Sequence, residues 1–416
     1  MSRINAAWLL LPLAAISLLN YNRILFMTTL TSFSAVTTGQ NLAMQPLINF
    51  SAVATEQNSA TQPLFDWPEN MATQSLDDIL NTLGASQKYE KEQGLNSSII
   101  PTAYYTPEKG LGIGALYAGL YNLSDTTLSQ PSSISLNSYY SENNSYGVSL
   151  KNKNFFEADK NRLFIHANIA NDASYFYGLS GQSQDVTNYK SEQFSADAVW
   201  LRKIARNIYL GFGVKGADIN PSDIDTNTTN NTDRLVKDSS IGGSLKIDYD
   251  SRDNVDNAFK GLNLGFQFNQ MYSNSQSETY EQYQVYYSQY HQFENLTGTL
   301  AWQVKGEFSS DNTPFVQLAN LGGDEKLRGY IEGRYVDNNM MFSQMEYRIP
   351  IYWRIGMVFW TGAGSVANDL SGLFDETLIS YGTGFRFNIK DRVNLRADIG
   401  FGDDGAEFYL NINEVF

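Results

Sequence analysis

The chain of 416 residues contains no cysteine and only two histidines. Without cysteine it can form no disulfide, no thiolate nucleophile and no cysteine-ligated metal site. His166 and His291 are isolated, with no acidic residue at metal-ligand spacing and no serine and aspartate setting for nucleophilic catalysis. We therefore expect no metal site, no cofactor and no catalytic residue, and we predict that the protein is not an enzyme.

Long apolar runs are also missing. A membrane-spanning helix needs about 20 consecutive apolar residues, and no segment of this sequence reaches that length. Basic residues are few, since 29 Lys and Arg face 44 Asp and Glu and leave a net charge of -15. This balance excludes nucleic acid as an expected partner, because phosphate binding needs a basic surface. A membrane protein of this sequence would have to cross with strands.

Aromatic residues, in contrast, are abundant, with 26 Tyr and 24 Phe. Only 18% of the residues are charged, and yet the mean hydropathy is mildly negative, at -0.34. Transmembrane β-barrels combine these traits, because their outer face is apolar, their lumen is polar and aromatic side chains ring both membrane interfaces. The composition favours such a barrel.

The N-terminal residues 1–54 have the pattern of an export signal. Arg3 precedes an apolar run over residues 6–19, and a second apolar run covers residues 24–33. Small residues at a spacing of two allow cleavage at about residue 34 or at about residue 54. We predict a signal region over 1–54 and leave both cleavage points open.

Residues 55–100 form a predicted periplasmic linker with one short amphipathic helix at about 75–84. Ser75 and Asp78 resemble a capping box, and Gly84 stands where a C-terminal cap belongs. An apolar stripe at helical spacing lies between them, comprising Leu76, Ile79, Leu80 and Leu83. Such a stripe would rest on the barrel or on the lipid interface, or plug the lumen, or belong to a frayed linker helix.

From Pro101 onward, apolar and polar residues alternate with a period of two, interrupted by turns rich in Asn, Ser, Asp and Gly. The fold class that this pattern predicts is a 16-stranded antiparallel transmembrane β-barrel over residues 101–416. An even number of strands brings both chain ends to the periplasmic side and leaves no unpaired edge in lipid. The predicted strands begin near residues 110, 132, 144, 161, 174, 190, 206, 239, 260, 279, 297, 340, 353, 378, 392 and 406.

The stretch from Leu318 to Asp337 places two glycine-flanked arginines in an otherwise loop-like connection after the eleventh predicted strand. Its segment Leu327, Arg328, Gly329 and Tyr330 resembles the lid-loop motif of the outer-membrane assembly-factor superfamily, the bacterial surface antigens that include BamA, TamA and FhaC. Further matches over residues 101–416 are the barrel entry 101–114, the periplasmic turn 249–261 and the strand segment 346–350. The resemblance implies a bacterial outer-membrane barrel whose lid loop, about 309–339, folds into the lumen.

The last predicted strand ends in phenylalanine at the C-terminus, which resembles the assembly signal of bacterial outer-membrane proteins. Its outward face is predicted to comprise Phe408, Leu410, Ile412 and Phe416, with Asn411 and Asn413 facing the lumen.

An arginine inside the barrel needs acidic partners, because removing its charge from water costs several kcal/mol otherwise. By strand parity Glu346 and Asp398 point inward on neighbouring strands, so we predict that these wall acids hold Arg328. The family's usual acid position is occupied here by Gly362. Two acids of the loop itself, Asp324 and Glu325, are expected to compete for the arginine.

The resemblance implies a role in assembly or translocation, in which the seam between the first and last strands opens. The superfamily's larger members carry POTRA modules ahead of the barrel, and we expect none within the linker. The alternative is a porin-like or structural barrel that takes part in envelope or lipid organisation. Expected partners are outer-membrane lipid and client proteins or a periplasmic partner, and the chain is expected to be a monomer.

Overall fold

The structure is a computed structural model that describes residues 62–83, 94–123, 130–181, 183, 185–293, 296–390 and 392–416. The predicted signal region and Gly84 lie outside the described residues. The predictions for them are therefore untested.

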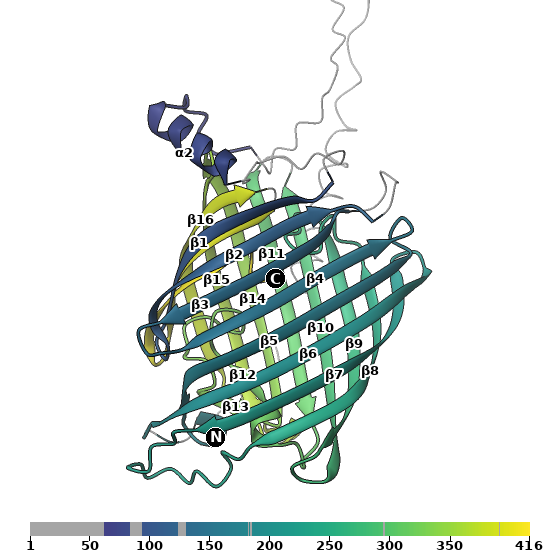
Figure 1. Ribbon diagram of the computed structural model, residues 1–416, viewed down its shortest axis with the longest axis vertical. Coiled ribbons are helices and arrows are strands. Elements are labelled where there is room, and N and C mark those ends of the chain that lie inside the picture. Colours follow the sequence, from purple (N-terminus) through teal and green to yellow (C-terminus); the bar gives the residue numbers. More distant parts are fainter. Residues whose placement is uncertain are drawn as a thin grey trace, which may run out of the picture. The chain divides into compact units, whose positions relative to one another are not determined.

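Sixteen strands form one antiparallel sheet in chain order, which curves into a barrel (Figure 1). The predicted fold class is confirmed. The barrel strands are β1 (Asn96–Thr106), β2 (Gly110–Tyr121), β3 (Ser132–Ser141), β4 (Tyr146–Phe156), β5 (Asn161–Phe176), β6 (Thr187–Ala205), β7 (Ile208–Ser222), β8 (Asp238–Asp250), β9 (Gly261–Ser273), β10 (Glu278–Phe293), β11 (Leu296–Ser309), β14 (Asn339–Tyr352), β15 (Ile355–Ala367), β16 (Leu378–Lys390), β17 (Val393–Gly402) and β18 (Gly405–Ile412).

The outer face of the barrel is apolar, as the period-two pattern requires. On β7, Phe212 and Val214 are 65% and 64% exposed, and on β8 Ile241 and Leu245 are exposed to a similar degree. In a bilayer these side chains contact acyl chains. No helix among the described residues is long and apolar enough to cross a membrane.

The predicted count of sixteen is correct although one strand was omitted and another was predicted in excess. The prediction omits β1 and places its first strand near residue 110, which is the start of β2. Pro101 is tolerated within β1 because this strand forms a ladder with β2 alone. The strand expected near residue 174 is instead the end of β5. Asn171 and Asp172 have the composition of a turn, but Asp172 is a buried strand residue that accepts a hydrogen bond from Tyr139 at 2.7 Å.

The seam between the two edge strands has overlapping edges at the end of the barrel where β1 begins. Among the described residues β1 and β18 form no ladder with each other. Ile100 is buried on the inward face of β1, whereas its neighbour Ile99 is 62% exposed. Ile100 belongs to a cluster that also contains Leu395 and Ile412 from the outward faces of β17 and β18. The C-terminal edge therefore lies inside the N-terminal edge, an arrangement that we call the lapped seam.

Helix α2 (Met71–Thr82) lies at the end of the barrel that carries the turn between β14 and β15 (Figure 1). It starts four residues before the predicted residue 75. The capping box is formed by Asn70 and Thr73, each side chain accepting the backbone N–H of the other. Ser75 lies inside the helix, where its hydroxyl donates to the carbonyl of Met71 at 2.8 Å. Ser75 therefore does not cap the helix.

The connection between β11 and β14, residues 310–338, is called the lid segment below. It contains η5 (Phe315–Gln317) and a small hairpin of β12 (Ala319–Leu321) and β13 (Tyr335–Asp337). Its apolar side chains form a buried cluster with Met340 and Phe342 of β14. Two other loops carry the short helices η4 (Leu179–Gly181) and η6 (Leu370–Gly372).

Candidate functional site

Arg328 is the most enclosed charged residue of the lid segment, with 0% of its surface exposed. Its Nη1 donates to Oδ2 of Asp398 on β17 at 2.7 Å, and its Nη2 donates to Oε1 of Glu346 on β14. The guanidinium lies over the indole of Trp360 on β15, 3.7 Å from the ring centroid. Two carboxylates and one aromatic face thus replace the lost hydration of the charge.

The backbone at the tip of the lid segment lies directly against β17. Leu327 and Gly329 have positive φ values of 63° and 116°. A Cβ atom added to Gly329 would lie 2.8 Å from the backbone of Phe401, so only glycine permits this approach. The N–H of Gly329 donates to the hydroxyl of Tyr409, which in turn donates to the carbonyl of Tyr330.

Tyr330 completes the tip and is fully buried. Its hydroxyl donates to the carbonyl of Ile379 on β16 at 2.8 Å and accepts the N–H of Asp403 at 3.2 Å. The four motif residues of the lid segment therefore contact the strands from β14 to β18, which form the C-terminal part of the wall.

Gly362 occupies the position at which the resemblance would place an acid. A Cβ atom there would lie 3.0 Å from Cδ1 of Leu327 and 2.9 Å from the carbonyl of Ser343. Leu327 of the lid segment fills the space that a carboxylate would need. The acids that contact Arg328 come instead from the strands on either side of β15 and β16.

Three wall arginines extend the contacts of Arg328 into a network. Asp398 also accepts from Arg386 and from Arg396, the latter at 3.3 Å. Glu346 also accepts from Nε of Arg348 at 2.9 Å. We call the connected group the lid network, and it comprises Arg328, Glu346, Arg348, Arg386, Arg396, Asp398 and Glu414.

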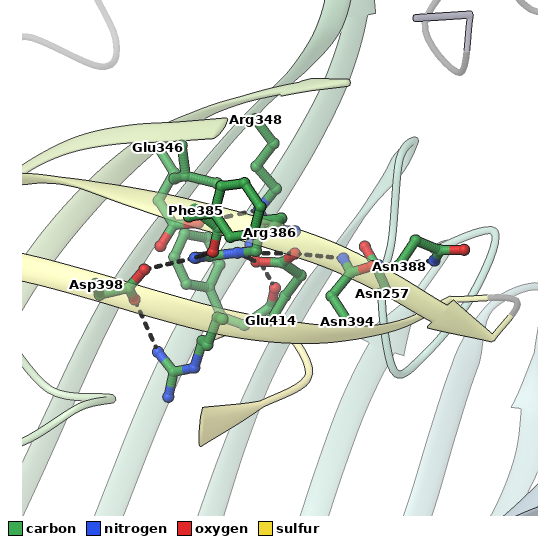
Figure 2. Close-up of polar contacts among 12 residues, drawn as sticks. Asn257, Glu346, Arg348, Phe385, Arg386, Asn388, Asn394, Asp398 and Glu414 are labelled. Atoms are coloured by element: carbon green, nitrogen blue, oxygen red, sulfur yellow. Dashed lines mark hydrogen bonds and ion pairs between the residues drawn. The ribbon is translucent and has the colours of Figure 1, made fainter. Parts of the chain in front are cut away.

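The lid network reaches the C-terminal tail through Glu414. Figure 2 shows Arg386 between Asp398 and Glu414, with its Nε donating to Oε2 of Glu414 at 2.9 Å. Burial opposes the charge of Glu414, but the guanidiniums of Arg386 and Arg348 outweigh it and lower the pKa of this carboxyl to about 2. The carboxylate is therefore ionised throughout the physiological range.

Phe416 turns into the lumen, so its predicted outward orientation is wrong. The strand ends at Ile412, and Asn413 adopts a left-handed φ of 68° that redirects the chain. The carbonyl of Phe416 accepts from Nη2 of Arg348 at 2.8 Å, and its ring lies 6.2 Å from that of Tyr290. Of the other predicted outward residues, Phe408 is 40% exposed, whereas Leu410 and Ile412 are half-buried.

The two acids of the lid segment that were expected to compete for Arg328 contact other cations. Asp324 accepts from Arg396 and from Asn411 on the wall. Glu325 lies 3.8 Å from Nζ of Lys151. The expected competition is therefore wrong, and Asp324 instead attaches the lid segment to β17 and β18.

Sequence reasoning did not find Trp360, Arg348, Arg386 or Glu414 as parts of this site. Strand parity places Arg386 and Arg348 on the inner face, and this signal could have indicated a cluster of inward arginines near Asp398. No comparable signal pointed to Glu414, because its position depends on the turn at Asn413.

A second network of arginine and aspartate lies at the periplasmic ends of β5, β7 and β8. Arg162 donates to Asp159 at 2.6 and 2.8 Å and to Asp250 at 2.6 Å, and it stacks on Tyr209 at 3.9 Å. Arg252 completes the group through Asp250. We call it the wall network, since its members come from wall strands and their short turns.

Among the residues that the structure describes, no group of three or more acidic or histidine side chains could hold a metal ion. His166 instead lies 3.4 Å from Asp197 in a partly exposed pair.

Comparisons with known proteins identify the architecture. Residues 126–416 match the family model described as the Omp85 superfamily domain. The solved structure of CdiB from Acinetobacter baumannii is 14% identical, with a TM-score of 0.50, and the match covers 79% of this chain and 60% of that chain. BamA from Haemophilus ducreyi, lacking POTRA domains 1–3, is 15% identical, with a TM-score of 0.48, and the match covers 85% of this chain and 80% of that one. No curated protein sequence matches significantly.

Proposed function

Because this chain belongs to the Omp85 superfamily and is a bacterial outer-membrane β-barrel, we propose that it assembles or translocates polypeptides by opening the seam between β1 and β18. The observation that carries the proposal is the missing ladder between these two edge strands. Every other neighbouring pair of barrel strands is joined by backbone hydrogen bonds, so the seam is the joint that opens with the fewest bonds broken.

A cavity with polar side chains beside the seam supports this proposal. A cavity of about 130 Å³ lies on the lumen side of the seam and is lined by Thr102, Tyr104, Tyr409 and Asn411, together with Tyr139 of β3 and Asp324 of the lid segment. Polar groups at an unpaired strand edge are suited to receive the backbone of an incoming strand. Outer-membrane proteins in transit are the clients that fit this chemistry.

The lid segment is proposed to gate the lumen, with Arg328 as its lock and with Glu346 and Asp398 as its anchors. Undocking would separate Arg328 from both carboxylates and from Trp360, so these contacts favour the docked lid. Asp324 links the same lid to β17 and β18, and the opening of the seam and the release of the lid would therefore be coupled.

Crosslinking tests the seam directly, because the chain has no native cysteine. The rings of Tyr105 on β1 and Phe408 on β18 lie 6.1 Å apart, so cysteines at both positions can be joined by a short thiol crosslinker. Closing the seam should abolish complementation in a strain that depends on the protein, and cleaving the linker should restore it. Full activity with a quantitatively crosslinked seam would overturn the proposal.

A porin-like channel is the competing function, and single-channel recording separates the two. Arg328 of the lid segment is fully buried against wall strands inside the barrel, which favours a plugged barrel. Small flickering currents are expected. Large steady currents would favour the channel. The absence of POTRA modules and a monomeric state stay predictions.

A further inference from the structure

Helix α2 and the segment before it expose apolar side chains that a soluble surface rarely leaves in water. Trp67 is 59% exposed, Met71 84% and Ile79 57%. Phe65 and Trp67 stack on each other with ring centroids 4.7 Å apart, and Trp67 lies 5.6 Å from the ring of Tyr352. Exposed apolar and aromatic side chains of this kind mark an interaction site.

The barrel holds this surface in a fixed position. Asp77 accepts from Nε of Arg354 at 2.6 Å and from Nε1 of Trp353 at 2.8 Å, both in the turn between β14 and β15. Leu80 packs against the cluster at the lapped seam. Ahead of the helix, the N–H groups of Leu64 and Phe65 donate to carbonyls of β14 at 2.9 Å each.

The residues that face the barrel and the exposed apolar residues lie on different sides of α2. Thr73, Asp77 and Leu80 follow a spacing of four and three, which places them on one face of the helix. Leu76 and Ile79 follow the same spacing on a stripe rotated from that face by about a quarter turn. The stripe therefore lies beside the barrel contact and stays uncovered by described residues.

We infer that α2 and the preceding segment with Phe65 and Trp67 lie in the periplasmic leaflet of the outer membrane, where lipid covers the apolar stripe. We call these residues, 62–83, the anchor. The surface continues the apolar outer wall, where Phe359 on β15 and Phe385 on β16 are 48% and 44% exposed. Tryptophan and tyrosine prefer the membrane interface, where their amphipathic rings sit at headgroup level. An amphipathic helix with one apolar stripe binds in the plane of that interface.

Charge indicates how this anchor binds. Residues 62–83 contain no lysine or arginine, and four acids stand among them, Asp66, Glu69, Asp77 and Asp78. Attraction to anionic headgroups needs basic residues, so it cannot hold this segment. The anchor must therefore bind by insertion of its apolar side chains, independently of anionic lipid and of salt.

The absence of cysteine permits a test on the full chain with single spin labels. Ile79→Cys places a label on the stripe, and Asn81→Cys is the matched control on the polar side of the same helix. Both variants are refolded into vesicles of phosphatidylethanolamine and phosphatidylglycerol, and heat-modifiable gel mobility verifies the barrel. We expect the label at position 79 to collide several-fold more with oxygen, and several-fold less with a water-soluble nickel complex, than the label at position 81.

Two results would overturn the inference. Equal access of nickel to both labels would place the stripe in water. Shielding of position 79 from nickel and oxygen alike would mean that protein covers it, either a partner or another segment of this chain. Vesicles of phosphatidylcholine alone, and a change from 0.1 to 1 M salt, should leave the accessibility at position 79 unchanged. Loss of insertion under either condition would contradict the uncharged mode of binding.

Discussion

The barrel contains two buried networks of arginine and carboxylate that use the same chemistry for different connections. The wall network joins β5, β7 and β8 through Arg162, Asp159 and Asp250. The lid network joins a long connection, the three wall strands β14, β16 and β17, and the C-terminal tail through Arg328 and its partners.

The two networks differ in whether the segments that they join are also held together by backbone hydrogen bonds. The strands that Arg162 joins are also held by continuous ladders, so the ion pairs add to bonds that already fix the geometry. The lid segment has no ladder to the wall among the described residues, and its position depends on side chains and on a few bonds at the tip. A buried ion pair that is the main attachment of a loop can act as a lock, whereas one between paired strands stabilises the wall.

Replacing Arg328 with alanine should have the largest effect. The change removes both ion pairs and the stacking on Trp360. Glu346 then keeps Arg348 as its partner, and Asp398 keeps Arg386 and Arg396. Each of the two lost charge-assisted hydrogen bonds contributes about 1.5 to 3 kcal/mol, so lid docking should weaken. Limited proteolysis should then cut the lid segment in the folded barrel, and a lid as resistant as in the wild type would contradict the lock.

Arg162→Ala tests the wall network in the same way. It leaves Asp250 with Arg252, and Asp159 with Tyr209 and Lys203, as remaining partners, so a loss of stability is expected. The temperature at which the barrel unfolds on a heat-modifiability gel should fall. The lid segment should remain as resistant to protease as in the wild type, since no contact of Arg162 reaches it.

Acid should loosen the C-terminal tail within a defined range of pH. The pKa of Glu414 is about 2 in the folded chain, against an ordinary value of 4.5. Because the folded value is the lower one, the stabilisation is complete above pH 4.5 and is lost as pH falls toward 2; the shift corresponds to about 3 kcal/mol. A spin label at Val415→Cys should gain mobility in that window. Adding Glu414→Gln should remove the pH dependence.

Adding a single methyl group should weaken the packing of the lid tip but not that of the wall, with a smaller effect than the loss of an arginine. A Cβ atom on Gly400 would lie 2.8 Å from the N atom of Gly329 in the lid tip, whereas one on Gly216 of β7 would find its nearest neighbour at 3.8 Å. Gly400→Ala should therefore weaken lid docking by about 1 to 3 kcal/mol, as overpacking does. Gly216→Ala is the control, and equal protease sensitivity of the two variants would argue against close packing of the tip.

The barrel and the position of the lid segment were predictable because alternation with a period of two is a strong local signal. Parity alone placed Glu346 and Asp398 on the inner face, and both now contact Arg328. The orientation of Phe416 was not predictable, since it depends on the left-handed turn at Asn413 and on the distant Arg348. The start of α2 was not predicted, because its capping box has Asn70 at the N-cap and Thr73 at the third position, where Glu or Gln is usual.

The conductance of Arg328→Ala and Arg162→Ala, recorded side by side in planar bilayers, tests the account most directly. If Arg328 locks a lid and Arg162 stabilises a wall, the first variant should show larger and longer openings than the wild type, and the second should match the wild type while the barrel remains folded. Unchanged openings in Arg328→Ala, or equal increases in both variants, would contradict the lock.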